Sequence, residues 1–331
     1  MRSVMTLPTL PLRMRRMRAS AALRAMVRET LLSPQDLIYP IFVDETIDRP
    51  RPVESMPGVS RLPLSSVAAV ARQTAALGIP GLMLFGIPAR KDAVGSSGWD
   101  ADGIVQRAIA EAKDAAPELV VIPDTCFCEY TDHGHCGVLD GERLLNDATL
   151  KNLQLEALSY ARAGADMIAP SGMIDGMVAA IRSALDEEGF QQIPIMSYAV
   201  KYASAWYGPF RDAADSAPGF GDRSTYQMDP ANGREAMREA ALDLAEGADI
   251  LMVKPGLAYL DVLCRLRDRF DCPLAVYNVS GEYAMIRQAA ANGWVDERRV
   301  VLETMTSFKR AGADLILTYF ALDVARWLGD A

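Results

Sequence analysis

The sequence predicts an α/β fold of the (β/α)8 TIM-barrel class with an N-terminal arm, and three features of the chain support this. Eight short apolar runs, often β-branched, recur along the 331 residues, as a parallel sheet covered on both faces requires. Segments with helical periodicity lie between most of these runs. The near-repeated phrases AGADMI, EGADIL and AGADLI mark the same helix-to-strand joint three times. Eight strand–helix units in a chain of this length fit one barrel.

The apolar runs are expected to form the strands in chain order. They are LIYPIFV (37–43), GLMLFG (81–86), LVVIPDTC (119–126), DMIAPSG (166–172), IPIMSYAVK (193–201), ADILMVKPG (248–256), PLAVYNVSG (273–281) and ADLILTYF (313–320). Helical segments precede several of them, with Gly164 and Gly247 as expected helix stops. A doubly wound open sheet is the alternative. It usually carries a glycine-rich phosphate loop after its first strand, and neither GxGxxG nor GxxxxGK(S/T) occurs here.

The chain is predicted to divide into an arm, residues 1–36, and a single catalytic barrel, residues 37–331. The first 28 residues carry seven arginines and no acidic residue before Glu29. An organelle presequence has a similar composition, but Pro8 and Pro11 interrupt a helix there and no small-residue cleavage pattern stands out. An arm that docks on another subunit is the preferred interpretation.

Composition excludes several classes of function. The net charge of −9 argues against general binding of nucleic acid. No apolar run approaches the ~20 residues that span a bilayer, so we expect a cytoplasmic protein without a membrane segment. Three of the five cysteines are crowded together, which favours a thiolate cluster over a disulfide framework.

Two connections are too long to be plain linkers. Residues 127–147 follow the third predicted strand, and residues 202–230 follow the fifth. Loops longer than ~15 residues in a compact domain are usually functional or disordered. Both leave the carboxyl ends of strands, the face of a barrel that carries active sites, so we expect a covered site there.

Two lysines end neighbouring strands of the predicted barrel. Lys201 and Lys254 follow runs of mostly uncharged residues in a chain that has only six lysines. Two ammonium groups close together in a low dielectric depress each other's pKa. This matters because an ordinary lysine is only about 0.04% neutral at pH 7. The pair therefore predicts a free amine that attacks a ketone to form an imine.

A thiol cluster follows the third strand. Cys126, Cys128 and Cys136 lie within 11 residues, beside the only histidines, His133 and His135. Three thiolates favour zinc and leave a fourth position open for water or substrate, as catalytic sites require. A structural site would add a fourth ligand, which either histidine could supply. The spacing alone favours a catalytic zinc.

Further polar residues converge on the same predicted mouth. Arg211 and Arg223 lie in the second long connection, and arginine suits bidentate capture of a carboxylate. At other strand ends stand Asp124, Ser171, Ser280 and Tyr319. Taken singly, each could be a solvated surface residue or a core residue whose polar group is hydrogen-bonded.

Three phrases, DTCFCEYTDHGHCG, SYAVKYASAWYGPFRDAA and LMVKPG, closely resemble the porphobilinogen synthase (5-aminolevulinate dehydratase) family. The similarity runs from RETLLSPQDLIYPIFV through APSGMIDGMV and GDRSTYQMDP to AVYNVSGEYAM, which covers essentially residues 10 to 325. The family joins two 5-aminolevulinate molecules into porphobilinogen, with loss of two waters, for tetrapyrrole synthesis. The three cysteines match its zinc-dependent branch, where another branch has carboxylates and depends on magnesium.

The resemblance implies a role for each matching residue. Lys254 would bind the ketone of the propionate-side substrate, and Lys201 that of the acetate side. Cys126, Cys128 and Cys136 would hold one catalytic zinc per subunit. The substrate-binding residues would be Arg211, Arg223 and Gln227 on the acetate side, Ser280 and Tyr319 at the propionate-side carboxylate, Asp124 and Ser171 near its amino group, and Tyr207 beside the lysines. Residues 202–230 would form a lid, and the arm would support a homo-octamer, with a hexamer as the alternative.

An activating magnesium site is not expected. Glu239 matches the carboxylate that contacts this ion in many bacterial relatives, but Gly172 replaces an aspartate that helps to hold the hydration shell. Compensation by Asp175 is the alternative. Two other functions are alternatives: a lysine-dependent class I aldolase, which needs one imine lysine and no metal, and a non-enzymatic metal-binding platform.

Overall fold

The computed structural model describes residues 11–330, which belong to two units that divide between Leu31 and Leu32. The first unit contains η1 (Met14–Arg18), a 3-10 helix, and α1 (Ala21–Met26). Its apolar side chains are largely uncovered: Leu12, Met14, Met26 and Leu31 are 63% to 80% exposed.

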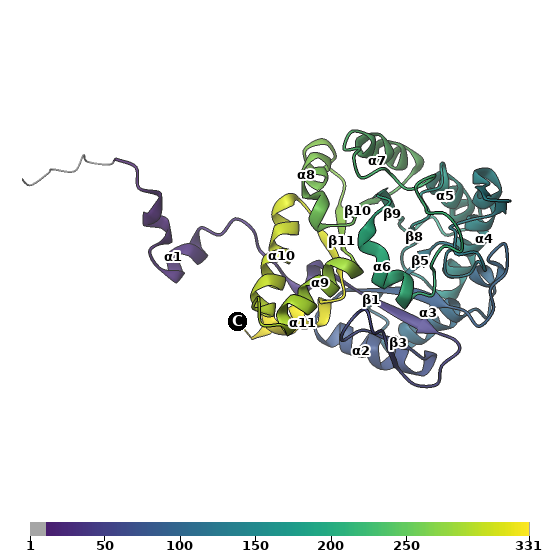
Figure 1. Cartoon of the computed structure of the whole chain (residues 1–331), viewed down its shortest axis with the longest axis horizontal. Helices are drawn as coiled ribbons and strands as arrows, with labels where there is room; N and C mark the ends of the chain where they lie inside the picture. Colours follow the sequence, from purple (N-terminus) through teal and green to yellow (C-terminus); the bar gives the residue numbers. More distant parts are fainter. Residues whose placement is uncertain (1–10, 331) are drawn as a thin grey trace, which may run out of the picture. The chain divides into compact units, whose positions relative to one another are not determined.

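The second unit is built on eight parallel strands (Figure 1). They are β1 (Leu37–Asp44), β4 (Gly81–Ile87), β5 (Val120–Thr125), β8 (Ala169–Pro170), β9 (Met196–Lys201), β10 (Ile250–Lys254), β11 (Leu274–Asn278) and β12 (Leu315–Thr318). Hydrogen bonds join them in the order β8-β5-β4-β1-β12-β11-β10-β9. A parallel bridge between Ile168 and Ile195, just before β8 and β9, closes the ring. The predicted (β/α)8 barrel is confirmed, and every predicted run supplies a strand.

Helices surround the strands in Figure 1. They are α2 (Val67–Ala76), α3 (Ile104–Ala115), α4 (Asn146–Ala163), α5 (Met177–Glu187), α6 (Gly208–Ala213), α7 (Glu235–Glu246), α8 (Leu260–Arg269), α9 (Ser280–Ala291), α10 (Glu297–Ala311) and α11 (Ala321–Gly329). Strands β4, β9, β10 and β11 are buried along their whole length. This burial explains why their sequences are unbroken apolar runs.

The thrice-repeated phrase has a structural cause. In each copy a glycine ends the helix in the left-handed conformation: Gly164 after α4, Gly247 after α7 and Gly312 after α10, with φ of 99°, 106° and 115°. The aspartate two residues later then accepts a hydrogen bond from an amide at the start of a neighbouring strand, at 2.8 Å in each case. The pairs are Asp166 with Val121, Asp249 with Ile195 and Asp314 with Leu274. The joint thus sets the register of adjacent strands.

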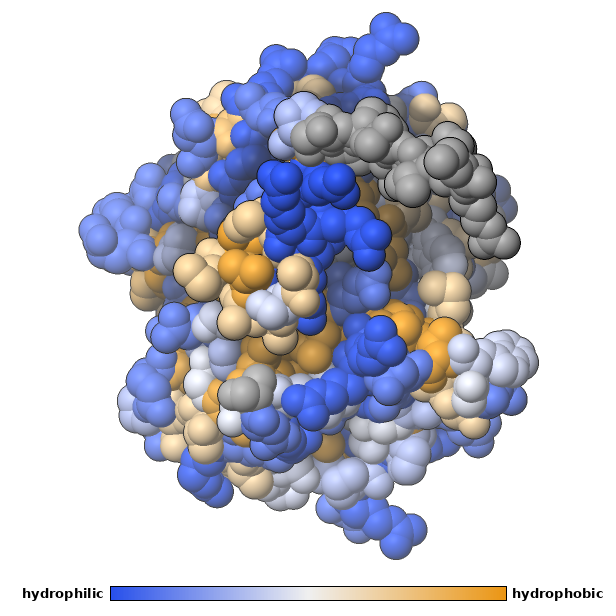
Figure 2. Space-filling view, turned by 90° about the vertical axis from the view of Figure 1, so that its left-hand side faces the viewer, coloured by the Kyte–Doolittle hydropathy of each residue, from blue (hydrophilic) through white to orange (hydrophobic). Residues whose placement is uncertain are grey.

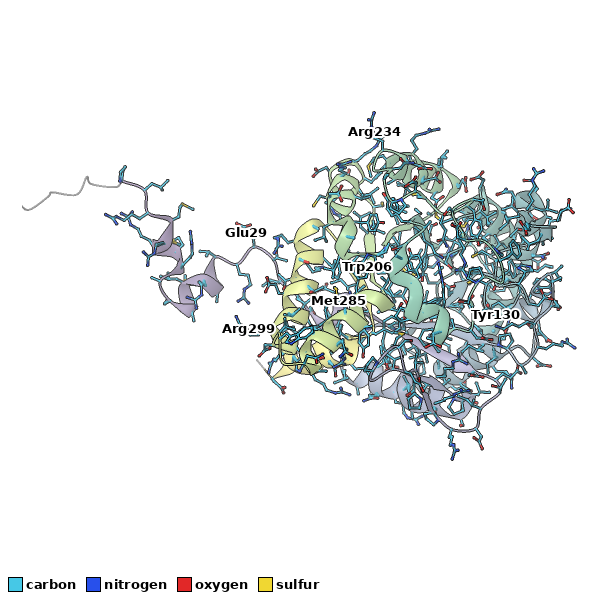
Figure 3. All side chains as sticks on the ribbon, in the orientation of Figure 1. Glu29, Tyr130, Trp206, Arg234, Met285 and Arg299 are labelled. Carbon is cyan, nitrogen blue, oxygen red and sulfur yellow. The ribbon has the colours of Figure 1, made fainter. Side chains whose placement is uncertain are left out.

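The two long connections carry short elements of their own. Residues 127–147 contain an antiparallel pair, β6 (Leu139–Asp140) and β7 (Arg143–Leu144). Residues 202–230 contain η5 (Ala205–Tyr207) and α6. In Figure 3 the labelled Trp206 of η5 lies near α6. The remaining short elements are β2 (Arg51–Pro52), β3 (Ser60–Leu62), η2 (Pro34–Asp36), η3 (Leu64–Ser66), η4 (Ser96–Trp99) and η6 (Leu257–Tyr259).

The surface is mostly hydrophilic in the view of Figure 2, with smaller apolar patches between the polar side chains. Exposed large apolar side chains are as numerous in residues 11–31 as in all of residues 32–330. None of the described helices is both long and apolar enough to cross a membrane.

Candidate active site

The lysine pair forms the centre of the site. Strands β9 and β10 end at Lys201 and Lys254, which are direct partners in the parallel register. Both side chains are buried, with 4% and 5% exposure. Lys201 Nζ donates a hydrogen bond to the Ser171 carbonyl oxygen at 2.5 Å. The sequence therefore predicted correctly that these two amines lie at the ends of adjacent strands.

Aromatic rings enclose the amine of Lys254. Its Nζ lies 4.4 Å from the ring centroid of Tyr277, 4.9 Å from Tyr198, 5.1 Å from Phe210 and 5.4 Å from Tyr207. Burial lowers the pKa of Lys254 to about 7, and the charge of Lys201 adds to this effect. About half of Lys254 is therefore the free amine at pH 7, the form that attacks a ketone.

Asp124 and Ser171 lie beside the lysines, in or next to β5 and β8. Ser171 Oγ donates to Asp124 Oδ2 at 3.0 Å, while Asp124 Oδ1 has no hydrogen-bond partner among the described residues. Burial raises the pKa of Asp124 to about 6, and the two lysines act in the opposite direction. The carboxyl therefore presents one free oxygen to a ligand.

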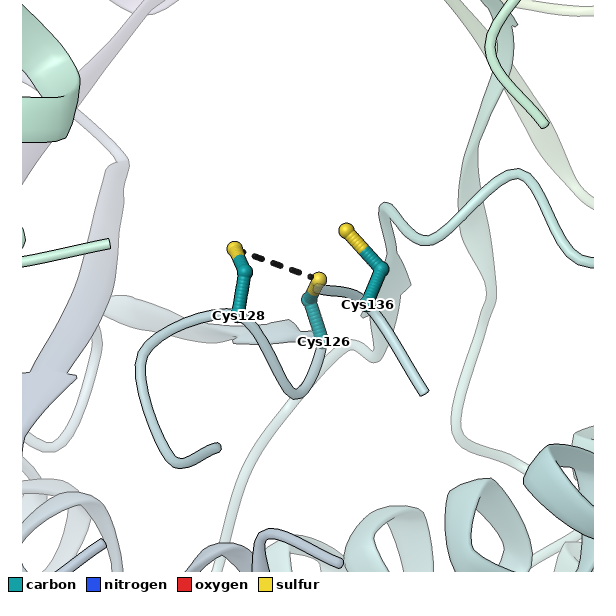
Figure 4. A group of neighbouring side chains, drawn as sticks. All are labelled: Cys126, Cys128 and Cys136. Atoms are coloured by element: carbon teal, nitrogen blue, oxygen red, sulfur yellow. Dashed lines mark hydrogen bonds between the residues drawn. The ribbon is translucent and has the colours of Figure 1, made fainter. Parts of the chain in front are cut away.

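The three predicted cysteines converge from one loop (Figure 4). Their sulfur atoms all lie within 4.8 Å of one another, and Cys126 Sγ is 3.5 Å from Cys128 Sγ. Thiolates bonded to one zinc at about 2.3 Å lie no more than about 4.6 Å apart, so the donor set fits a single soft ion. All three are buried and free of disulfides.

Neither histidine completes this group. His135 engages Tyr226 Oη at 3.1 Å through Nδ1 and the Phe220 carbonyl at 3.2 Å through Nε2. His133 Nδ1 accepts from the His135 amide at 3.1 Å, and its Nε2 lies 3.2 Å from the Ala93 carbonyl. Within residues 11–330 the thiol group contains three ligands and no imidazole, as a catalytic site with an open position would have.

The second long connection contributes polar atoms without partners. Arg223 is 4% exposed and donates to the carbonyls of Gly134 at 2.9 Å and Ser216 at 2.7 Å. Its Nε, the Nε of half-buried Arg211 and both amide atoms of Gln227 have no partner among the described residues. Because unpaired buried polar atoms are costly, these groups are suited to binding a polar ligand.

The last predicted residues lie on η5, at the start of α9 and directly after β12. Tyr207 Oη donates to the Lys254 carbonyl at 3.1 Å. Ser280 Oγ accepts from the Phe210 amide at 2.9 Å, which ties α9 to α6. Tyr319 Oη lies 2.8 Å from Tyr277 Oη. Each of the three residues therefore contacts either Lys254 itself or a residue whose ring lies over the Lys254 amine.

Glu239 lies apart from the lysine pair. It lies on α7 and lines a cavity of about 900 Å³ that also includes Asp175, Glu235 and residues 224–229 of the second connection, but neither lysine. Burial raises the pKa of Glu239, and the charge of Asp175 adds to this effect.

The sequence analysis missed several residues of the site. Glu129, next to Cys128, is 2% exposed, and its Oε2 lies 3.1 Å from Cys128 Sγ. The position of this acidic residue directly after the cysteines, in the phrase CFCEY, was the signal from which the sequence could have predicted it. The residues Tyr198, Phe210 and Tyr277, whose rings lie over the Lys254 amine, were also missed. Tyr198 and Tyr277 lie in apolar runs, where aromatic residues are usually core, and Phe210 lies in the second long connection.

Comparisons with known proteins agree with this geometry. The family model described as delta-aminolevulinic acid dehydratase matches residues 11–327. The delta-aminolevulinic acid dehydratase of Synechococcus elongatus is 59% identical over 320 residues, covering 96% of this chain and 98% of the relative. That of Bacillus subtilis is 56% identical over 318 residues, covering 96% and 98%.

A solved structure shares the whole fold. The Toxoplasma gondii delta-aminolevulinic acid dehydratase (porphobilinogen synthase), in complex with its reaction product porphobilinogen, superposes with a TM-score of 0.95 at 45% identity, covering 97% of this chain and 93% of that one. The chain therefore belongs to the delta-aminolevulinic acid dehydratase family, the hydro-lyases with porphobilinogen synthase activity.

Proposed function

We propose that the family's reaction, condensation of two 5-aminolevulinate molecules into porphobilinogen with release of two waters, proceeds in this chain through imines at Lys254 and Lys201. The observation that carries the proposal is the buried lysine pair on β9 and β10, with the pKa of Lys254 at about 7. A class I aldolase needs only one such lysine and gives no role to a buried trithiol group.

Each imine forms by attack of a neutral Nζ on a substrate ketone, whose oxygen leaves as water. The carbon beside the imine becomes acidic because the imine accepts its electrons, and this permits formation of the carbon–carbon bond. The family resemblance assigns the propionate-side substrate to Lys254 and the acetate side to Lys201. Asp124 and Ser171 would bind the amino group of the propionate-side substrate, using the free oxygen of Asp124.

The substrate carboxylates would be held on both sides of the lysines. Arg211, Arg223 and Gln227 offer partnerless buried donors for the acetate side. Ser280 and Tyr319 would bind the propionate-side carboxylate, with Tyr207 packed against the lysines. Residues 202–230 would then act as a lid, since they carry four of these side chains.

Cys126, Cys128 and Cys136 would hold one catalytic zinc. Three buried thiols at mutual ligand distance, without a fourth protein ligand from either histidine, support this assignment. When bound, zinc would supply Lewis acidity toward substrate oxygen or nitrogen atoms.

The arm would join subunits into a homo-octamer, with a hexamer as the alternative. The exposed apolar side chains of Leu12, Met14, Met26 and Leu31 support this, because such side chains stabilise a protein only when a contact, such as one between subunits, buries them.

One experiment tests the proposal as a whole. Turnover of 5-aminolevulinate to a pyrrole should occur with purified protein and should be lost with a zinc chelator. Borohydride added with substrate should increase the mass of the peptide carrying Lys254, and Lys254→Met should abolish both signals. Substrate mass found only on Lys91 or Lys309 would contradict it.

A further inference from the structure

Glu282, in the first turn of α9, is a buried carboxylate that the proposed chemistry does not use. Its side chain belongs to a residue that is only 1% exposed, and both of its oxygens are engaged. Oε2 accepts from Asn278 Nδ2 at 2.9 Å and from the Val279 N–H at 3.1 Å. Oε1 accepts from the Leu257 N–H at 2.7 Å. One carboxylate therefore joins the start of α9 to the end of β11 and to the backbone that follows β10.

Capping of α9 explains only one of these three hydrogen bonds. A glutamate at the third position of a helix commonly accepts from the N–H of the residue that precedes the helix, here Val279. Burial raises the pKa of Glu282 to about 7, a cost that a cap exposed to water would avoid. The bonds from Asn278 and Leu257 add nothing to the cap, so they indicate a further role.

The backbone around Lys254 is held from several sides. The Lys254 carbonyl oxygen accepts from Tyr207 Oη at 3.1 Å. Gly256 packs so closely that a Cβ there would lie 2.6 Å from Cε1 of the Phe308 ring. The bond to Glu282 follows at the next residue along the chain. This carboxylate therefore completes the support of the segment that leads away from the reactive lysine.

The same carboxylate reaches the strand that carries one of the rings over the amine. Asn278 directly follows Tyr277, whose ring centroid lies 4.4 Å from Lys254 Nζ. Asn278 Oδ1 in turn accepts from Thr318 Oγ1 at 2.9 Å, and both residues are fully buried. This buried chain of hydrogen bonds fixes the carboxyl ends of β10, β11 and β12 relative to one another.

We propose that Glu282 is a positioning residue for imine formation, which sets where the Lys254 amine lies relative to the bound ketone. It does so by tying the Leu257 N–H to Asn278, and hence β10 to β11. Within residues 11–330 its hydrogen bonds reach neither reactive lysine, so it acts through the strand ends. A misplacement of about 1 Å by such a support can slow a reaction about 100-fold. This role rests on the imine chemistry proposed for Lys254.

The test is borohydride trapping and steady-state turnover of 5-aminolevulinate with the full-length, zinc-loaded Glu282→Asp protein. This variant keeps a carboxylate that can cap α9 at Val279, but its side chain is one methylene shorter and cannot also reach Leu257. Trapping at Lys254 and kcat should each fall about 10- to 100-fold, while KM changes less than about threefold because the carboxylate-binding groups remain. A role in capping alone predicts wild-type values.

Asp314→Asn is the matched control. Asp314 also accepts an N–H of β11, that of Leu274 at 2.8 Å, but at the amino end of the strand, away from the lysines. This variant should lower the thermal stability and leave trapping at Lys254 and kcat unchanged.

Glu282→Gln serves if Glu282→Asp does not fold, as judged by circular dichroism. It has the length of the native side chain, but its NH2 group meets an N–H donor on one side and so opens the bond to either β10 or β11. The same loss of trapping and kcat is expected.

Three results would overturn the role of Glu282. One is wild-type trapping and kcat in a folded Glu282→Asp protein. Another is an equal loss in Asp314→Asn, which would mean that trapping follows overall stability. The third is a raised KM with an unchanged kcat, which would place the effect on substrate binding at Ser280. Failure of the proposed function looks different: the wild-type protein itself would gain no substrate mass at Lys254.

Discussion

At the residue scale, the protein lowers the charge of one of the two amines on which the proposed chemistry depends. Four aromatic rings surround Lys254, and ring faces favour a cation, yet its pKa is lowered to about 7. Burial of the ammonium group has the largest effect on this pKa, and repulsion by Lys201 adds to it, while Asp124 acts in the opposite direction.

A pH dependence follows from this pKa. The neutral form of Lys254 increases as the pH rises through about 7, so borohydride trapping at Lys254 should increase about tenfold from pH 5 to 6 and level off above about pH 8. Lys201→Met removes a charge that lowers this pKa, and it should therefore move the rise to higher pH. A trapping curve that is flat from pH 5 to 9 would contradict the assignment.

At the element scale, contacts of Asp212 and Asp215, near the middle of the connection 202–230, tie this connection to other parts of the chain. Lys91 Nζ donates to the Asp215 carbonyl at 2.5 Å and to its carboxylate at 2.7 Å. Arg61 donates to the Asp212 carbonyl, and Ser55 to the Asp212 carboxylate, both at 2.6 Å. Asp215 has a φ of 50°, in the left-handed region that aspartate tolerates better than most residues. These contacts would hold residues 202–230 closed as a lid without making the segment rigid.

Lys91→Met should loosen this segment. A partly exposed ion pair is worth about 0–1 kcal/mol, so hydrogen exchange and protease cleavage within residues 208–222 should accelerate by up to about fivefold. KM should rise while kcat changes little. Lys113→Met is the matched control, since Lys113 also joins a carboxylate to backbone carbonyls, but away from this segment. Equal exchange rates in Lys91→Met and the wild type would count against the lid.

Helix α7 carries the remaining prediction about metals. Glu239 faces a cavity with Asp175, but Gly172 provides no carboxylate to orient waters around a magnesium ion. We expect turnover of the zinc-loaded enzyme to be nearly flat in added Mg²⁺. Saturable activation that disappears in Glu239→Gln would show that Asp175 compensates.

At the scale of the whole molecule, the first unit exposes the surface that a subunit contact would cover. Deletion of residues 1–28 should give smaller assemblies in light scattering and lower activity, because Met14 and Met26, 63% and 80% exposed, could no longer be buried between subunits. Circular dichroism should remain that of a folded barrel. An unchanged molecular mass would argue against the arm's role in assembly.

The sequence by itself determined the barrel and much of the site. The apolar runs, the glycine stops and the repeated aspartates are local signals. Of these, Asp166, Asp249 and Asp314 bond the amide at the start of a neighbouring strand in the structure. Because Lys201 and Lys254 end consecutive strands, their proximity followed from the fold class alone.

Only the tertiary structure decided how groups distant in sequence meet. The rings around Lys254 come from separate elements, and Asp124, Ser171 and the two lysines come together only when the ring of strands closes. Both histidines proved to be engaged elsewhere, while Glu129 proved to be buried beside the thiols. Periodicity reports which face a residue occupies, but it carries no information about which side chain lies opposite, and that relation depends on strand register and loop path.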